Sequence, residues 1–254
     1  MSNYKVIFPN TFTMANAVFG FLAILEAIEG RVINASWFIL LAALMDGLDG
    51  KVARLSGAGS QFGIELDSLA DFLSFGVAPA VILYSIKLND LGKWGWIISV
   101  IFIMAAAFRL ARYNVLADTD EKKDFMGLPV PMAALTLVSY IIFSYRIWGD
   151  LEYGEVLVSM IVLFAILMVT QVQYDAMPDN FHTRQGRIKL GLLLLAAVFL
   201  AINVRLLLFP ILCTYILFGI VREIYRLFAT GIGKVSGQSL HRRKTDIDRA
   251  DDDE

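Results

Sequence analysis

The sequence predicts an all-α integral membrane protein, a polytopic helix bundle of about eight transmembrane helices. Three observations predict this class: of 254 residues 57% are hydrophobic, only 18% are charged, and long apolar runs recur along the chain. Soluble domains are about one-quarter charged, and a helix needs about 20 apolar residues to cross the hydrocarbon of a bilayer. The runs lie at residues 12–28, 33–54, 62–87, 94–116, 128–146, 154–172, 188–204 and 207–228.

The two ends of the chain decide how these runs are counted. The first run resembles a signal peptide in length, but only Lys5 precedes it and further runs follow at once, so we expect a retained helix. The last two runs are separated only by residues 203–205. From about Gly231 the chain is too polar to bury a core. We therefore expect a transmembrane domain over 1–230 and a disordered tail over 231–254.

The distribution of basic residues predicts the orientation. With eight spans, 17 of the 22 Lys and Arg residues fall on one face, and positive charge favours the cytoplasm. We expect a multi-pass protein of the cell membrane with both termini cytoplasmic. The net charge of −2 indicates no nucleic-acid partner. The five basic residues expected on the opposite face are Arg31, Lys87, Lys93, Arg146 and Arg205.

Four aspartates stand at the adjoining ends of the second and third runs. Asp46 and Asp49 share one helical face with Gly50 and Ala53, and Asp67 and Asp71 share one with Gly63. Two glycines, at 57 and 59, favour a turn between the helices. The carboxylates are therefore expected to converge at the cytoplasmic end of the bundle.

Such a cluster needs positive charge, because carboxylates near the membrane interior cost several kcal/mol. Oxygen ligands favour a hard divalent cation, Mg²⁺ or Mn²⁺, with Ca²⁺ as an alternative. Four carboxylates suit two ions, and two ions suit a polyanionic substrate. Gly50 and Gly63 would let a nucleotide approach the backbone, and Arg54 could bind its phosphate. For the glycines alone, close helix packing is the more ordinary explanation.

The spacing D-x-x-D-G-x-x-A-R, eight residues, G-x-x-x-D-x-x-x-D resembles the signature of the CDP-alcohol phosphotransferase family. It is filled here by Asp46, Asp49, Gly50, Ala53, Arg54, Gly63, Asp67 and Asp71. The resemblance implies transfer of a substituted phosphate from a CDP-linked donor to an alcohol, with release of CMP. It also implies metal ligation by all four aspartates, a general base at Asp71, and a homodimer. In "PNTFTMANAVFG" it implies that Thr13 and Asn16 face the nucleotide.

The acceptor is indicated by three further stretches. "SLADFLSFGVAPA", "FRLARYNV" at 108–115 and "FMGLPVPMA" at 125–133 resemble the phosphatidylserine synthase branch of that family. This implies CDP-diacylglycerol and L-serine as substrates. Arg109 and Arg112, three residues apart, could hold the serine carboxylate and a donor phosphate, with Asn114 as a polar neighbour. The positive-inside rule explains the two arginines equally well.

Three alternatives remain open at this point. The acceptor could be glycerol 3-phosphate or an inositol phosphate, and the donor could be an archaeal ether lipid. A cation transporter would use the acidic cluster as an ion site. Transport favours ligands near the middle of the membrane, whereas these aspartates are expected near one end. The enzyme is therefore the favoured reading.

Overall fold

The computed structural model describes residues 4–56, 61–117, 127–170, 203–223 and 225, and over these residues it contains helices and no strand. The chain divides into two units, Met1–Thr214 and Tyr215–Glu254. Everything that follows concerns the first unit unless stated. Its elements are α1 (Tyr4–Ile28), α2 (Val32–Ser56), α3 (Gln61–Asp71), the π-helix η1 (Phe72–Val77), α4 (Ala78–Ile86), the 3₁₀ turn η2 (Leu88–Leu91), α5 (Lys93–Ala117), α6 (Val130–Trp148) and α7 (Gly154–Val169).

The all-helical, multi-pass prediction is confirmed, although the count of eight spans is not. Six described helices are long and apolar enough to cross a membrane, the last of them being Asn203–Glu223. The helix α7 is apolar but has only 16 residues, fewer than the predicted 154–172. The predicted span 188–204 and the tail 231–254 lie almost wholly outside the described residues. Residues 203–205, which separate the last two predicted runs, are helical in the structure.

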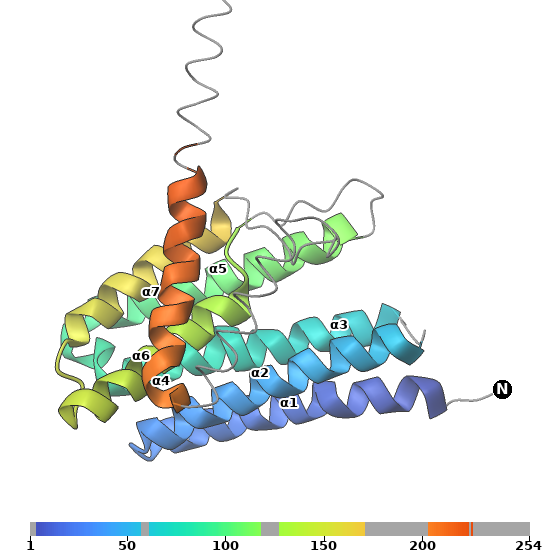
Figure 1. The fold of residues 1–254 in the computed structure, drawn as a ribbon, viewed down its shortest axis with the longest axis horizontal. Helices are drawn as coiled ribbons and strands as arrows, with labels where there is room; N and C mark the ends of the chain where they lie inside the picture. Colours follow the sequence, from blue (N-terminus) through green and yellow to red (C-terminus); the bar gives the residue numbers. More distant parts are fainter. Residues whose placement is uncertain (1–3, 57–60, 118–126, 171–202, 224, 226–254) are drawn as a thin grey trace, which may run out of the picture. The chain divides into compact units, whose positions relative to one another are not determined.

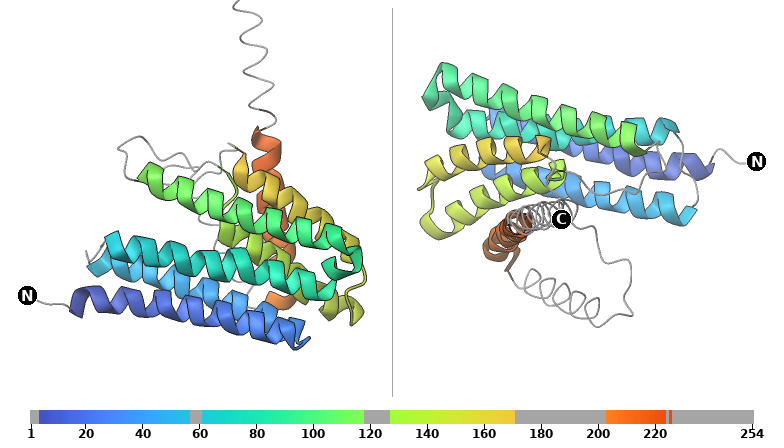
Figure 2. Two further views of the ribbon diagram at one scale, coloured as in Figure 1. Left: turned by 180° about the vertical axis from the view of Figure 1, so that it is seen from behind. Right: turned by 90° about the horizontal axis from the view of Figure 1, so that it is seen from above.

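The hairpin of α1 and α2 is built on small side chains. Ala23 and Ala27 of α1 and Ala35 and Ala42 of α2 are almost completely buried, which lets the two backbones approach closely. Gly30 adopts a positive φ of 77° in the turn, a conformation that favours glycine at a helix C-terminus. Figure 1 and Figure 2 show α1, α2 and α3 side by side, with the end of α2 and the start of α3 at the same end.

The third predicted span is one continuous helical path with an irregular centre. It runs from α3 through η1 into α4, Gln61–Ile86. Pro79 lies at the start of α4, where its missing N–H removes a helical hydrogen bond and so favours a local change of helix type. Such π segments are frequent at functional sites, and this one follows directly after Asp71.

The helix α5 is joined to α7 through a group of backbone carbonyls. Arg112 of α5 donates to the carbonyl oxygens of Met168, Val169 and Thr170 over 3.2–3.4 Å. The N–H of Leu128 donates to the Leu167 carbonyl over 3.0 Å. These contacts satisfy carbonyls that the C-terminus of α7 would otherwise leave open. The "GLPVP" segment is thereby held against the end of α7.

The outer faces of the helices are apolar, as expected next to lipid. On α1 the large exposed side chains recur at helical spacing. They are Met14, Val18, Phe21, Leu25 and Ile28. In the second unit, the helical residues expose Leu217, Phe218, Val221 and Tyr225.

Candidate functional site

The helical spacing predicted that all four aspartates converge, and the structure brings three of them into one group. Asp46 and Asp49 lie one turn apart on α2 and Asp67 lies on α3, and each offers a carboxylate oxygen within 4.8 Å of the others. No ion pair with a Lys or Arg of the described residues involves any of them. Oδ1 of Asp67 is buried and has no hydrogen-bond partner among the described residues. A buried carboxylate oxygen without a donor is costly, so this donor set fits a hard divalent cation.

Asp71 lies at the end of α3 and is not a member of this group of three. Its side chain is 8% exposed, and its Oδ1 accepts a hydrogen bond from Nδ2 of Asn16 over 2.9 Å. Asn16 belongs to α1 and is fully buried. The Asn16 amide therefore fixes the orientation of the Asp71 carboxylate from across the bundle.

The helix α1 holds a second aspartate in the same way. The Thr13 hydroxyl donates from Oγ1 to Asp49 Oδ2 over 2.9 Å. Thr13 and Asn16 are three residues apart and so lie on one face of α1. Both predicted polar residues of the first helix are thus in contact with the acidic cluster. Oδ1 of Asn16 is buried without a partner among the described residues, so it could accept a hydrogen bond from a ligand.

Two residues that the sequence analysis did not single out, Gly20 and Ser74, fix the position of α1 along η1. The Ser74 hydroxyl donates to the Asn16 carbonyl oxygen over 2.9 Å. A Cβ on Gly20 would lie 2.2 Å from Ser74 Oγ, so only glycine permits this approach. The signal was present in the sequence, because Gly20 follows Asn16 by one helical turn and Ser74 follows Asp71 by three residues.

The three predicted acceptor-binding residues on α5 lie in different surroundings. Arg109 is 6% exposed, and its Nε has no hydrogen-bond partner among the described residues. Its guanidinium carbon lies 6.0 Å from the ring centre of Tyr113. Arg112 donates instead to the carbonyls at the end of α7. Buried and incompletely paired, Arg109 is the arginine suited to an anionic ligand.

Asn114 connects α5 to the acidic helix α3. Its Nδ2 donates to Ser68 Oγ over 2.9 Å, and the Ser68 hydroxyl lies 3.1 Å from Asn114 Oδ1. Glu65 Oε2 is 3.5 Å from the same Nδ2. Ser68 directly follows Asp67, so this contact positions the segment of α3 that carries two aspartates.

The predicted nucleotide-binding positions are only partly described. Gly50 and Gly63 are half-buried residues of α2 and α3. Nothing larger than hydrogen projects from the backbone at either position. The side chains of Ala53 and Arg54 lie outside the described part of the chain.

A bundle of apolar helices with a cluster of aspartate carboxylates towards one end defines a multi-pass membrane protein with a candidate divalent-metal site. The family model described as CDP-alcohol phosphatidyltransferase matches residues 6–172, which contain every one of these site residues. The chain belongs to the CDP-alcohol phosphatidyltransferase family.

Curated relatives cover most of the chain. A protein of Helicobacter pylori strain 26695 named CDP-diacylglycerol–serine O-phosphatidyltransferase is 36% identical over 88% of this chain and 93% of its own. One of the same name from Methanocaldococcus jannaschii is 35% identical over 84% of this chain and 92% of its own. A protein of Methanothermobacter thermautotrophicus named archaetidylserine synthase is 35% identical over 66% of this chain and 70% of its own.

Proposed function

We propose that this protein transfers the phosphatidyl group of CDP-diacylglycerol to the hydroxyl of L-serine, giving phosphatidylserine and CMP. The observation that carries the proposal is the approach of Asp46, Asp49 and Asp67 to within 4.8 Å, inside the region matched by the family model. The names of the relatives support serine as the acceptor. The acidic cluster supports a metal-dependent reaction.

We assign Asp46, Asp49 and Asp67 to metal binding, with Asp71 reaching a second ion. Two such ions, Mg²⁺ or Mn²⁺, would neutralise the pyrophosphate of the donor and the charge that develops on the leaving CMP. The unpaired Oδ1 of Asp67 supports this assignment. Ca²⁺ has the same oxygen ligands but is larger and less strict in geometry.

Asp71 is assigned the role of general base. Asn16 occupies Oδ1 of the carboxylate, which leaves Oδ2 to take the proton of the serine hydroxyl. The serine oxygen then forms a bond to the β-phosphorus of the donor, the bond from that phosphorus to the CMP oxygen breaks, and its electron pair leaves with CMP. A base must lie within hydrogen-bond reach of the proton it removes, and the Asn16 contact holds the carboxylate ready for this.

Arg109 is assigned to the serine carboxylate. It is buried, its Nε has no hydrogen-bond partner within the described part of the chain, and it lies on the helix next to η1. A guanidinium can bind a carboxylate through two parallel hydrogen bonds. Arg112 could still contact a donor phosphate, but its bonds to the α7 carbonyls make it a support for this wall of the site. Asn114 is assigned to the same wall through Ser68.

The nucleotide is assigned to the surface of α2 and α3 beside Gly50 and Gly63, with Ala53 and Arg54 one turn further along α2. The cytosine amino group or a ribose hydroxyl would supply the donor that Oδ1 of Asn16 lacks. Thr13 would support the nucleotide indirectly by holding Asp49. We further propose a homodimer in the cytoplasmic membrane with both termini on the cytoplasmic side.

An acceptor and donor panel tests the function. Purified protein is given CDP-diacylglycerol with serine, glycerol 3-phosphate or inositol phosphate, and release of CMP is followed with Mg²⁺, with Mn²⁺ and with EDTA. A parallel series uses the ether-linked CDP-archaeol, because one relative is named archaetidylserine synthase. We expect turnover with serine only, and none with EDTA. Turnover with glycerol 3-phosphate in place of serine, or metal flux into liposomes without CMP release, would overturn the proposal.

A further inference from the structure

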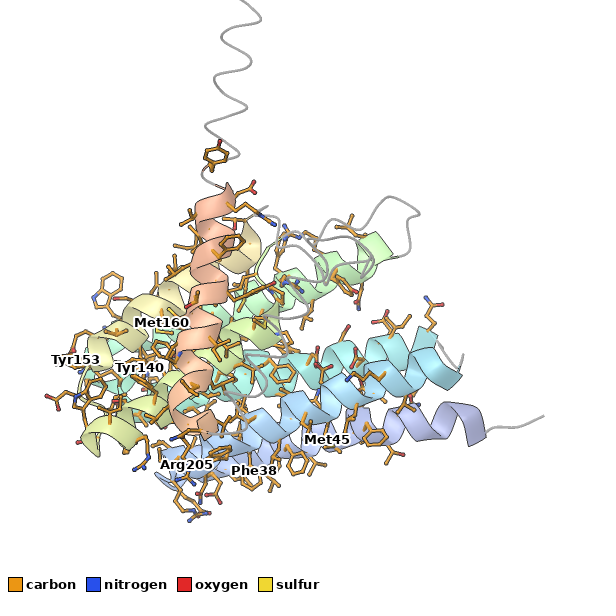
Figure 3. The ribbon with its side chains drawn as sticks, in the orientation of Figure 1. Phe38, Met45, Tyr140, Tyr153, Met160 and Arg205 are labelled. Atoms are coloured by element: carbon orange, nitrogen blue, oxygen red, sulfur yellow. The ribbon has the colours of Figure 1, made fainter. Side chains whose placement is uncertain are left out.

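A second polar site lies far from the acidic cluster, at the end of the bundle where α1 passes into α2. A cavity of about 300 Å³ opens there between the start of α2, the end of α6 and the described helical residues that follow Asn203. It is lined by Ile33, Trp37, Ile142, Tyr145, Arg146 and Arg205. Figure 3 labels Arg205 near the beginning of α2, whereas Met45, the neighbour of Asp46, lies further along the same helix.

Arg146 and Arg205 line this cavity, and neither forms an ion pair with a carboxylate of the described residues. At the same end Arg31, by contrast, is paired with Glu26 over 2.6 Å and also with Glu29. Asp150 lies beside the Tyr145 hydroxyl and accepts the N–H of Leu151 over 2.7 Å. The cavity therefore keeps an excess of positive charge.

The aromatic contact of Arg205 leaves its hydrogen-bond donors available to a ligand. Its guanidinium carbon lies 5.7 Å from the ring centre of Trp37, which is within the range of a cation–π interaction. A cation–π interaction uses the charge of the guanidinium and none of its five N–H donors. An oxyanion in the cavity could therefore accept hydrogen bonds from Arg205, with Arg146 lining the same cavity.

The remaining lining is what a membrane interface provides. Trp37 and Tyr145 are aromatic residues at the ends of apolar spans, where such rings lie at the level of the lipid headgroups. Ile33 and Ile142 give the cavity an apolar side. A volume of about 300 Å³ is at the lower limit for ligand sites, so it suits a headgroup rather than a whole lipid.

We propose that this cavity binds the phosphate of an anionic phospholipid from the leaflet opposite the acidic cluster, with its acyl chains along the apolar spans. Basic pockets between transmembrane helices bind anionic headgroups in this way. Arg146 and Arg205 contact the phosphate, and Trp37 and Tyr145 border the glycerol. The site is independent of the catalytic proposal, because none of its residues belongs to the acidic cluster.

Trp37 makes the test local. The chain has four tryptophans, and replacing Trp94, Trp96 and Trp148 by Phe leaves Trp37 as the only fluorescent indole. The full-length single-tryptophan protein is placed in phosphatidylcholine vesicles containing phosphatidylglycerol or phosphatidylethanolamine with brominated acyl chains. Quenching of Trp37 then measures which lipid occupies the cavity, without interference from lipid at the catalytic site.

We expect phosphatidylglycerol to be preferred over phosphatidylethanolamine by about fivefold or more, which is the contribution of one well-placed basic residue. The double substitution Arg146→Gln and Arg205→Gln should bring the preference close to one. The matched control is Lys93→Gln, which removes a basic residue from the same end without touching the cavity, and it should keep the preference. CMP release by each variant checks folding and should stay unchanged.

Three results would overturn the proposal: equal quenching by the two lipids, an unchanged preference in the double variant, or an equal loss in Lys93→Gln. Loss of the preference on adding excess inorganic phosphate would identify free phosphate as the ligand and so also overturn it. If the double variant does not fold, Arg146→Gln alone serves, because Arg146 is exposed at the end of α6. That single change should lower the preference severalfold, and an unchanged preference would contradict the proposal.

Discussion

Nδ2 of Asn16 donates a hydrogen bond to Oδ1 of Asp71 over 2.9 Å, joining α1 to the end of α3 across 55 residues of sequence. Both side chains are buried. This hydrogen bond fixes the orientation of the Asp71 carboxylate beside the proposed metal-binding aspartates. In the proposed mechanism this orientation decides whether Asp71 can take a proton.

Removing this hydrogen bond should therefore slow the chemical step. Asn16→Ala should lower kcat about tenfold or more with a smaller change in the KM for serine, since a hydrogen bond to a charged group contributes about 1.5–3 kcal/mol. Initial rates of CMP release measure both constants. The control Ser36→Ala alters a buried residue of α2 whose hydroxyl donates to the Val32 carbonyl of the same helix, and it should keep kcat. A kcat within twofold of the unaltered protein for Asn16→Ala would remove Asn16 from the mechanism.

Metal affinity should depend on the three converging carboxylates. Asp67→Asn should weaken Mn²⁺ binding by at least about tenfold, because a carboxylate ligand is replaced by a neutral amide. Titration of the protein with Mn²⁺, followed by electron paramagnetic resonance of the free ion, measures the affinity without turnover. Asp90→Asn, an exposed aspartate at the opposite end of the bundle, is the control. Equal affinity in the two variants would contradict the metal assignment.

Arg109 should affect the binding of the acceptor's carboxylate and should not affect its hydroxyl or its amine. Arg109→Gln should raise the KM for serine at least about tenfold, the effect of losing a charge-assisted hydrogen-bonded pair. Turnover of serinol, which has the hydroxyl and the amine but no carboxylate, should change little. A parallel loss with both acceptors would show that Arg109 supports the structure instead. Arg112→Gln is the companion variant, and we expect it to lower the melting temperature because three carbonyls of α7 lose a donor.

The close approach of α1 to η1 predicts a steep cost for one methyl group. Gly20→Ala would bring a Cβ to 2.2 Å from Ser74 Oγ and 2.8 Å from its Cα, so the helices must separate. We expect a loss of about 1–3 kcal/mol, as for other overpacked sites, seen as a lower melting temperature of the detergent-solubilised protein. Gly47→Ala is the matched control, because a Cβ there meets nothing within 4 Å. Helix propensity should make that change neutral or stabilising. Equal melting temperatures would refute the packing argument.

The sequence could predict the class of fold and the aspartate cluster because both depend on spacing within single helices. Helical periodicity places Asp46 and Asp49 on one face of α2, and Asp67 and Asp71 on one face of α3. The structure confirms that the first three converge. The count of eight spans could not be derived in the same way. Apolar length alone does not show where the helix Asn203–Glu223 is divided from the apolar run before it in the sequence. It also does not show that α7 ends at Val169.

What lay beyond the reach of the sequence was the pairing of groups from different helices. Spacing along α5 makes Arg109 and Arg112 look alike. The first is buried, and its Nε has no partner among the residues that the structure describes, whereas the second donates to the carbonyls that end α7. Periodicity likewise cannot show that Asn16 donates a hydrogen bond to Asp71, or that Ser74 packs directly against Gly20. Composition and spacing determined that this chain forms membrane helices carrying a carboxylate stripe, because those properties belong to single helices. Which polar atoms are satisfied and which remain free for a ligand was decided only by tertiary packing, because each such pair joins residues from separate helices.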